Sequence, residues 1–147
     1  MSSAPPIIRN ATPADAAEIA RLSAQLGYPA SADTFAARLR MLLESPRHAV
    51  LVALADGERL SGFVATEQRI SLELGERVEI VALVVDSEAR RAGVGKALVA
   101  AAEQWAADIG TPHVFLRSNI LRQESHPFYE SLGYTRTKTQ HAYTKPL

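Results

Sequence analysis

The stretch Glu79–Gly110 places the strongest constraint on how this 147-residue chain can fold. Residues 80–85 are apolar at every position, which is typical of a strand with both faces covered. From Gly93 to Ile109, apolar residues recur at steps of three and four, which predicts an amphipathic helix that Gly110 ends. The stretch therefore predicts a buried strand, a short basic loop that contains glycines, and a helix.

The loop between this strand and helix has the composition of an anion-binding site. It reads Arg90-Arg91-Ala92-Gly93-Val94-Gly95 and is followed by Lys96. The glycines let a ligand approach the main chain, and the free N–H groups of the first helical turn point toward it. The helix dipole and the basic side chains add positive potential. We therefore expect this loop to bind a phosphate or a pyrophosphate group.

The spacing of the glycines separates this loop from two common phosphate-binding loops. A Walker loop needs glycine at 90 and Ser or Thr at 97, where this chain has Arg90 and Ala97. A Rossmann fingerprint needs a third glycine at 98, in a turn that directly follows the strand. Here Leu98 falls on the predicted core face, and seven residues separate Val85 from Gly93. A plain surface turn with chance glycines stays open as an alternative on the evidence of this loop alone.

The pattern that fits is Arg/Gln-x-x-Gly-x-Gly/Ala after a strand that ends in apolar residues and Asp. The stretch Leu83–Gly95 closely resembles the acetyl-CoA-binding motif of the GNAT superfamily of N-acetyltransferases, except that Ala92 stands where many members have glycine. Near the C-terminus, Asn119 and the run F-Y-E-S-L-G-Y at 128–134 resemble a second motif of the superfamily. The two motifs occur in the expected order and separation, so the resemblance covers roughly residues 6–146.

The rest of the sequence fits the layout of that superfamily. Strands are predicted over 6–9, 48–55, 60–68, 77–85, 113–117, 134–138 and 141–145. Helices are predicted to begin at Thr12 and at Ser31 or Asp33, and a short helix is predicted over 123–132. The resemblance implies an α/β (α+β) fold of the GNAT type, in one domain over 1–147. We expect a mixed, mostly antiparallel sheet of 6–7 strands, flanked by about four helices and splayed between strands 4 and 5.

The resemblance also implies how acetyl-CoA binds. The pyrophosphate would lie on the loop, in contact with Arg90, Arg91, Ala92, Gly93, Val94, Gly95 and Lys96. The pantetheine arm would pair, like an extra strand, with main-chain groups of Leu83, Val84 and Val85. A main-chain N–H of Val84 or Val85 would then polarise the acetyl carbonyl. Phe128 and Asn119 complete the expected cofactor contacts, although Asn119 equally fits a loop residue that satisfies its own turn.

The resemblance implies that Tyr129 protonates the departing thiolate. It matches the tyrosine that many members use as general acid, on a short helix that would aim its hydroxyl at the thioester sulfur. The alternative is that Phe128 and Tyr129 are simply an aromatic pair that packs this helix onto the sheet.

Glu79 is our candidate for the base that takes a proton from the amine. It matches in position a glutamate that some histone-acetylating members use in this way, and we expect it on the same face as residues 81, 83 and 85. A carboxylate beside an apolar strand would be partly desolvated, which favours proton uptake near neutral pH. Two alternatives stay open. Glu79 could instead pair across the strands with Arg69, and water could carry the proton.

Composition limits the other function classes. Lys plus Arg equals Asp plus Glu at 16 each, so the chain lacks the basic excess that accompanies nucleic-acid binding. There is no cysteine, and the four histidines share no ligand spacing, so we expect no metal. No signal peptide and no apolar run of membrane length are apparent, so a cytoplasmic protein without a membrane partner is expected.

The sequence therefore predicts an N-acetyltransferase that transfers an acetyl group from acetyl-CoA to a primary amine of a small molecule or peptide, by direct attack in a ternary complex. A non-catalytic acyl-CoA-binding or regulatory module is the alternative, and Tyr129 together with Glu79 favours the enzyme. Tyr28, between the first two helices, is expected to contact the substrate, or else to pack on the core as a helix cap. A homodimer is common in the superfamily, but no feature of this chain decides it.

Overall fold

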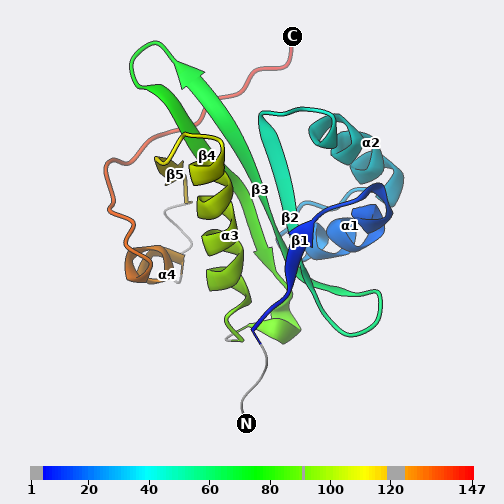
Figure 1. Ribbon diagram of the computed structural model, residues 1–147. Helices are drawn as coiled ribbons and strands as arrows, with labels where there is room; N and C mark the ends of the chain where they lie inside the picture. The colour runs from blue at the N-terminus through cyan, green and yellow to red at the C-terminus, as the bar shows by residue number, and fades with distance from the viewer. Residues whose placement is uncertain (1–4, 91, 119–124) are drawn as a thin grey trace. The chain divides into compact units, whose positions relative to one another are not determined.

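The computed structural model describes residues 5–90, 92–118 and 125–147 (Figure 1). They divide into two compact units, Met1–Leu116 and Arg117–Leu147, which are described separately.

The first unit is built on a five-stranded sheet in the order β1-β2-β3-β4-β5. The strands are β1 (Ile8–Asn10), β2 (His48–Leu54), β3 (Leu60–Ser71), β4 (Gly75–Val85) and β5 (Val114–Leu116). Neighbouring strands are antiparallel from β1 to β4, and β5 lies parallel to β4. The chain crosses from β4 to β5 through a helix, as the predicted strand-helix-strand stretch requires.

The four α-helices expected from the sequence are present. They are α1 (Ala16–Gln25), α2 (Ala32–Leu43), α3 (Val94–Asp108) and α4 (Ser125–Ser131), with short 3-10 turns η1 (Pro13–Asp15) and η2 (Ser87–Ala89). The predicted start near Thr12 is a 3-10 turn, with α1 following it. Of the two predicted starts of α2, Ser31 is the N-cap, because its hydroxyl accepts a hydrogen bond from the N–H of Thr34 at 3.1 Å, while Asp33 lies in the first turn.

The prediction of two further strands at the C-terminus, over 134–138 and 141–145, is wrong. Residues 134–147 are all described, yet none of them lies in a strand, so the sheet of the described residues has five strands rather than 6–7. The physical reason is the composition of the segment. Its polar side chains are mostly exposed and offer no apolar face, and a two-stranded hairpin without such a face is at best marginally stable by itself.

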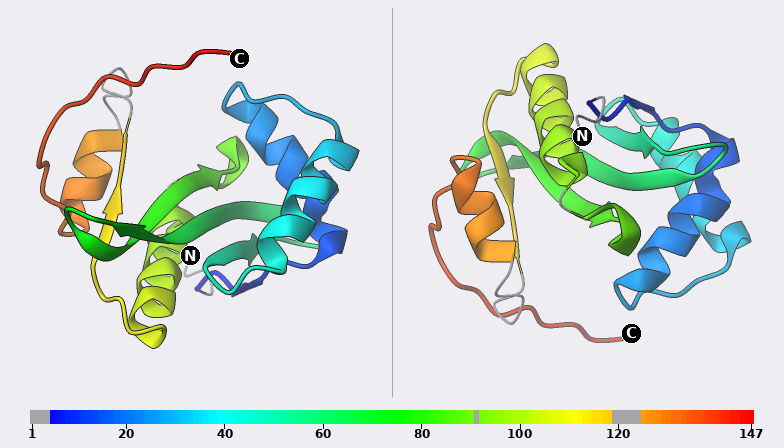
Figure 2. Two further views of the ribbon diagram at one scale, coloured as in Figure 1. Left: turned by 90° about the horizontal axis from the view of Figure 1, so that it is seen from above. Right: turned by 90° about the horizontal axis from the view of Figure 1, so that it is seen from below.

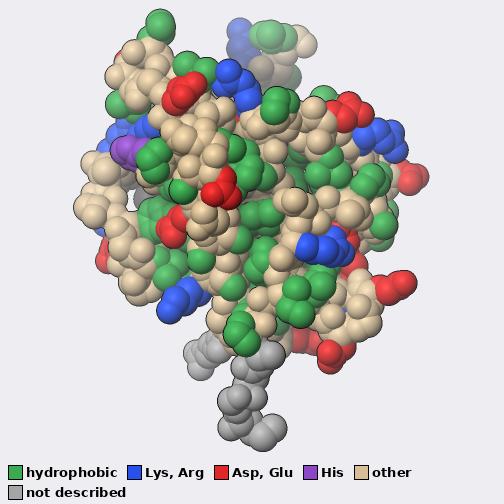
Figure 3. Space-filling view, in the orientation of Figure 1, with side chains coloured by type: hydrophobic (Ala, Val, Ile, Leu, Met, Phe, Trp, Pro, Cys, Tyr) green, Lys and Arg blue, Asp and Glu red, His purple; other side chains and the backbone are tan. Residues whose placement is uncertain are grey.

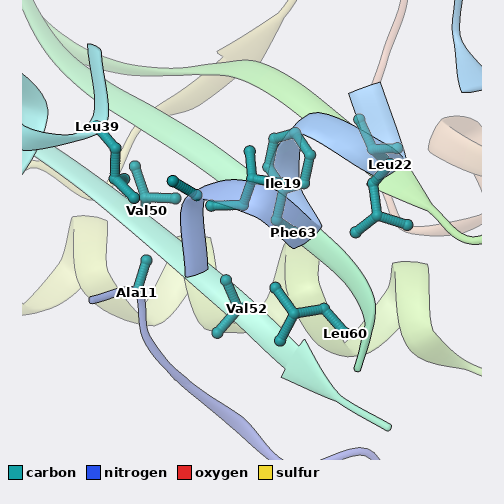
Figure 4. Packing of buried hydrophobic residues seen from close by; sticks show 10 residues of the cluster. Ala11, Ile19, Leu22, Leu39, Val50, Val52, Leu60 and Phe63 are labelled. Atoms are coloured by element: carbon teal, nitrogen blue, oxygen red, sulfur yellow. The ribbon is translucent and has the colours of Figure 1, made fainter. Parts of the chain in front are cut away.

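The two faces of the sheet are covered by different helices (Figure 2). One face packs against α1 and α2, in a core that contains Ala11, Ile19, Leu22, Leu39, Val50, Val52, Leu60 and Phe63 (Figure 4). The other face packs against α3, which approaches β3 closely at Gly62. A Cβ on Gly62 would lie 3.0 Å from Leu98 and 3.2 Å from Val94, so glycine at this position lets the helix lie directly on the strand.

Candidate functional site

The loop that follows β4 is held in two successive turns. Asp86 caps η2, since its carboxylate accepts a hydrogen bond from the N–H of Glu88 at 3.1 Å. Arg90 is extended, and Gly93 adopts φ +80°, a left-handed conformation that glycine reaches without strain. No heavy atom lies within 4 Å of where a Cβ on Gly93 would be. Glycine is therefore required here by the backbone conformation rather than by lack of space.

Helix α3 begins directly after this glycine with its first amides unoccupied by any described side chain. Its first intrahelical bond is donated by Ala97 to the carbonyl of Gly93, at 3.0 Å. The N–H groups of Val94, Gly95 and Lys96 precede that bond, and within the described first turn there is neither a side-chain cap nor an acidic residue. The helix terminus thus presents free donors and a positive dipole end to an anion. Among the other predicted cofactor contacts, Arg91 lies outside the described residues.

Beside this terminus, β4 runs past the end of its neighbour β5. The pairing of the two strands ends at Ile80 and Leu116, while β4 continues to Val85. At the same point β4 contains a β-bulge. Ile80 pairs with Thr66 and Ala82 with Ala65, so Val81 is an extra residue, and it is 56% exposed. From the bulge to Val85, the described part of β4 pairs only with β3 and presents an open edge on its other side.

The register determines which main-chain groups face this open edge. The N–H of Asp86 donates to the carbonyl of Ser61 at 2.8 Å, and the carbonyl of Val84 lies only 2.6 Å from the position of a Cβ on Gly62. The main-chain groups of Val84 are therefore directed toward β3. Because these directions alternate along a strand, those of Leu83 and Val85 face the open edge. The expectation that Val84 offers its main chain to a ligand is corrected accordingly.

The bulge also corrects the expected orientation of Glu79. On β3, Glu67 lies opposite Glu79 and Phe63 lies opposite Val84. Glu67 and Phe63 are four residues apart on one strand, so they share one face of the sheet. Glu79 thus lies on the face covered by α1 and α2, whereas Leu83 and Val85 turn to the α3 face. The prediction that Glu79 shares a face with residues 83 and 85 is wrong, because the extra residue at Val81 inverts the alternation.

Glu79 is buried and forms the cross-strand ion pair that the sequence left open. Its side chain is 11% exposed, and its Oε1 accepts a hydrogen bond from Nη1 of Arg69 at 2.9 Å. Arg69 also lies near Glu67, with 3.6 Å between Nε and Oε1. The guanidinium therefore lies between two carboxylates that face each other across β3 and β4.

Tyr28 lies in the segment that joins α1 to α2. Its N–H donates to the carbonyl of Ser23 at 3.2 Å, which closes the end of α1, and the residue is 66% exposed. The alternative in which this ring packs on the core as a helix cap is therefore wrong. The ring is free of the core and accessible from solvent.

The second unit holds the aromatic residues of the C-terminal motif. On α4, the rings of Phe128 and Tyr129 meet edge to face with their centroids 5.2 Å apart, and Tyr134 lies against Tyr129 at 6.2 Å. The carbonyl of Tyr129 accepts hydrogen bonds from Leu132 and Tyr134, both at 3.1 Å, where the helix ends. The predicted aromatic contact between residues 128 and 129 is present. Asn119 lies outside the described residues.

The sequence model of the Acetyltransferase (GNAT) family matches residues 16–134, which is most of the chain and includes both motifs. The chain belongs to the GNAT acetyltransferase family. It is accordingly an acetyl-CoA-dependent N-acetyltransferase, as the sequence predicted.

Full-length relatives agree with this assignment. The chain is 32% identical to an aminoglycoside N(6')-acetyltransferase type 1 of Stenotrophomonas maltophilia, over 100% of this chain and 97% of that protein. Its fold is similar to that of AAC(6')-Iy in complex with a bisubstrate analogue of CoA, with a TM-score of 0.85 and 23% identity over 98% and 100% of the two chains. An aminoglycoside 6'-N-acetyltransferase of Acinetobacter haemolyticus has a TM-score of 0.82 and 21% identity over 96% and 99%.

This acetyltransferase contains a polar network that sequence reasoning missed. On α1, Arg21 binds Glu18 through two hydrogen bonds of 2.9 Å, and its Nη1 donates to Oδ2 of Asp86 at 3.0 Å. Gln25 donates to Oδ1 of Asp86 at 3.3 Å and accepts a hydrogen bond from the N–H of Ser87 at 3.0 Å. The network therefore joins α1 to the start of the loop between β4 and α3.

The same network is tied to the first residue of β3. The N–H of Leu60 donates to Oε1 of Glu18 at 2.9 Å, and its carbonyl accepts from Nη2 of Arg21 at 3.0 Å. The only sequence signal was the spacing of Glu18 and Arg21, three residues apart on one helix. Nothing in the sequence marks Asp86 as their partner, because it follows 65 residues after Arg21.

The carboxylates of the network are held in their charged forms. The N–H of Glu88 and the guanidinium of Arg21 hold the pKa of Asp86 below its ordinary value, although burial acts in the opposite direction. The hydrogen bonds from Arg21 likewise lower the pKa of Glu18. In return, Glu18 and Asp86 raise the pKa of Arg21. At neutral pH the network therefore consists of one cation and two anions.

The remaining surface of the acetyltransferase shows no further concentration of charge on the face seen in Figure 3, where acidic and basic side chains are interspersed. Within the described ranges, no group of three or more His, Cys, Asp or Glu residues is arranged to hold a metal ion. None of the helices in the described part of the chain is long and apolar enough to span a membrane.

Proposed function

We propose that this acetyltransferase transfers the acetyl group of acetyl-CoA directly to a primary amine of a small molecule, with both substrates bound together. The observation that carries the proposal is the open edge of β4, which begins at the bulge and ends beside the uncapped terminus of α3. One end of this edge offers main-chain partners to an extended chain of amides. The other end offers donors to a pyrophosphate. Acetyl-CoA contains both groups in that order.

In this proposal the pyrophosphate accepts hydrogen bonds from the first amides of α3, within reach of the basic side chains of the loop. The pantetheine arm pairs with the main-chain groups of Leu83 and Val85, as an additional strand would. The other predicted contacts, Arg90, Arg91, Ala92, Gly93, Val94, Gly95, Lys96, Asn119 and Phe128, belong to the same proposal. The acetyl group would lie where β5 ends, near the bulge.

The transfer itself requires the substrate nitrogen to lose two protons and the thiolate to gain one. The substrate ammonium gives a proton to the carboxylate of Glu79, directly or through water, and its nitrogen attacks the acetyl carbonyl carbon. A main-chain N–H of the open edge stabilises the oxyanion that forms. When the tetrahedral intermediate collapses, the carbon–sulfur bond breaks and the thiolate takes the proton of the Tyr129 hydroxyl. The nitrogen then gives up its second proton, through water, to the Tyr129 phenolate. The products are the acetylated amine and CoA.

We propose aminoglycosides as the first class of acceptor to test. The relative that supports this choice is 32% identical and is matched over nearly its full length. Tyr28 is exposed and could contact a sugar ring of such a substrate.

The test is the release of CoA, measured with a thiol reagent across aminoglycosides, other small amines and peptides. The chain has no cysteine, so the protein gives no background signal. Release that depends on one class of amine would support the proposal and define the acceptor. Binding of acetyl-CoA without release for any amine would favour the non-catalytic module. Absence of acetyl-CoA binding would refute the proposed cofactor site.

A further inference from the structure

We propose that Gln25 and Arg21 of α1 are positioning residues for the cofactor, and that they set the affinity for acetyl-CoA from the face of the sheet opposite α3. This inference rests on the proposed cofactor site at the start of α3. Neither residue is expected to contact the ligand. They act by fixing Asp86 and Ser87, where the chain leaves β4 and turns toward that site.

Gln25 connects the end of α1 to the turn that follows β4. Its side-chain amide bridges two groups of the turn, since Nε2 donates to Asp86 at 3.3 Å and Oε1 accepts from the N–H of Ser87 at 3.0 Å. The side chain is otherwise on the surface, at the last residue of α1. Both ends of one amide are thus used to hold the same short turn, which points to a specific anchoring role.

The second step is that the turn is restrained from several directions at once. Asp86 is 6% exposed and accepts hydrogen bonds from Arg21, Gln25 and the N–H of Glu88, while its own N–H donates to the carbonyl of Ser61. The carbonyl of Asp86 accepts from the N–H of Ala89 at 2.9 Å. The turn η2 is therefore fixed to both α1 and β3.

The third step is that α1 does not depend on this turn for its own position. Ile19 and Leu22 are 5% and 0% exposed and pack in the core with Phe63 and Val84. Loss of the Gln25 contacts should therefore loosen the turn at Ser87 while α1 stays in place. A ligand that needs the loop ordered would then have to supply the ordering free energy itself, which lowers its affinity.

The experiment compares Gln25→Met with the wild-type chain. Methionine has a similar length and helix propensity but cannot form the two hydrogen bonds. We expect the Kd for CoA, measured by calorimetry, to rise roughly threefold to tenfold, as the loss of two partly exposed hydrogen bonds predicts. The KM for acetyl-CoA should rise by a similar factor, while the KM for the amine and the melting temperature should change little.

Two further variants sharpen the comparison. Gln25→Glu keeps an acceptor for the N–H of Ser87 but places a negative charge beside Asp86, so its Kd should rise at least as much as that of Gln25→Met. Gln104→Met is the matched control. Gln104 is also exposed on a helix, and its amide bonds only Asp108 at 2.8 Å among the hydrogen bonds described, so its replacement should leave the Kd unchanged.

Amide hydrogen exchange separates positioning from general destabilisation. In Gln25→Met the N–H groups of Ser87 and Glu88 should exchange faster, while those of α1 keep their protection. An unchanged Kd would overturn the proposal. So would a raised Kd accompanied by faster exchange throughout α1, because the effect would then follow from loss of the helix. A wild-type chain that fails to bind CoA would instead refute the cofactor site itself.

Discussion

At the scale of single residues, the site depends on groups whose chemistry can be removed without changing their shape. Tyr129→Phe removes the proposed general acid and keeps the ring contacts with Phe128 and Tyr134. We expect kcat to fall by at most ~10²–10⁴-fold, because protonation of the leaving group contributes no more than this. The measurement is the rate of CoA release at saturating acetyl-CoA. A variant with unchanged kcat would show that Tyr129 only packs α4.

Asp86 provides a prediction about acid stability. Its pKa is lowered in the folded state, so its contribution to stability is present above the ordinary value of 3.8 and is lost as the pH falls below that value toward the folded pKa. Asp86→Asn should therefore be less stable than wild type at neutral pH, with the difference shrinking below about pH 4. Urea denaturation at several pH values measures this. A difference that stays constant into acid would contradict the assigned role of the carboxylate.

Some of the site residues could be predicted from the sequence, and others could not. Gly93 and the basic loop were recognised because a left-handed glycine and a free helix terminus follow from local rules. Glu79 can be picked out from its position in the motif. Its ion pair with Arg69 is only one alternative at the level of sequence, because a cross-strand contact depends on register. The network around Arg21 was missed entirely, since it joins groups that are distant in sequence.

At the scale of elements, the contact between β3 and α3 depends on Gly62. A Cβ there would lie 2.6 Å from the carbonyl oxygen of Val84, a main-chain atom of β4 that cannot easily move away. It would also lie 3.0 Å from the side chain of Leu98 on α3. Gly62→Ala should therefore destabilise the fold by about 1–3 kcal/mol, as overpacking of a core does. It should also weaken CoA binding, because α3 would move away from the sheet at its first turns, near Val94.

Chemical denaturation and CoA titration test this prediction together. Gly57→Ala is the comparison, because a Cβ at Gly57 would meet no atom within 4 Å while its φ of +68° still strains a larger residue. That variant should lose about 1–2 kcal/mol from backbone strain alone and keep its affinity for CoA. Equal losses of CoA affinity in the two variants would contradict the packing argument.

Not every feature of the secondary structure could be predicted from the sequence. The strands and helices of the first unit were predicted closely, because their apolar periodicity is long and regular. The bulge was not, since Val81 is an apolar residue among apolar residues and nothing local identifies it as unpaired. The last two predicted strands were wrong because alternating Thr and basic residues favour a strand only where a neighbouring strand is available.

At the scale of the whole molecule, ligand binding should appear as a gain in stability. A ligand that binds only the folded chain stabilises it by about 2.7 kcal/mol at a concentration one hundred times its Kd. CoA should therefore raise the melting temperature in thermal denaturation, whereas pantetheine, which lacks the pyrophosphate, should raise it much less at the same concentration. Equal shifts with both ligands would show that the terminus of α3 does not contribute. A shift with ATP but none with CoA would reassign the site to a nucleotide.

The bulge in β4 has a consequence for how this chain can diverge. Substitutions along the strand leave each position on its present face, so the residues before and after Val81 can change one at a time. Deletion of Val81 would remove the bulge and leave a regular ladder, because Ile80 and Ala82 already pair with the consecutive residues Thr66 and Ala65. Val84 would still pair with Phe63 and stay in the core shared with α1 and α2. We therefore expect descendants of this gene that shorten β4 by one residue to lose that residue at the bulge.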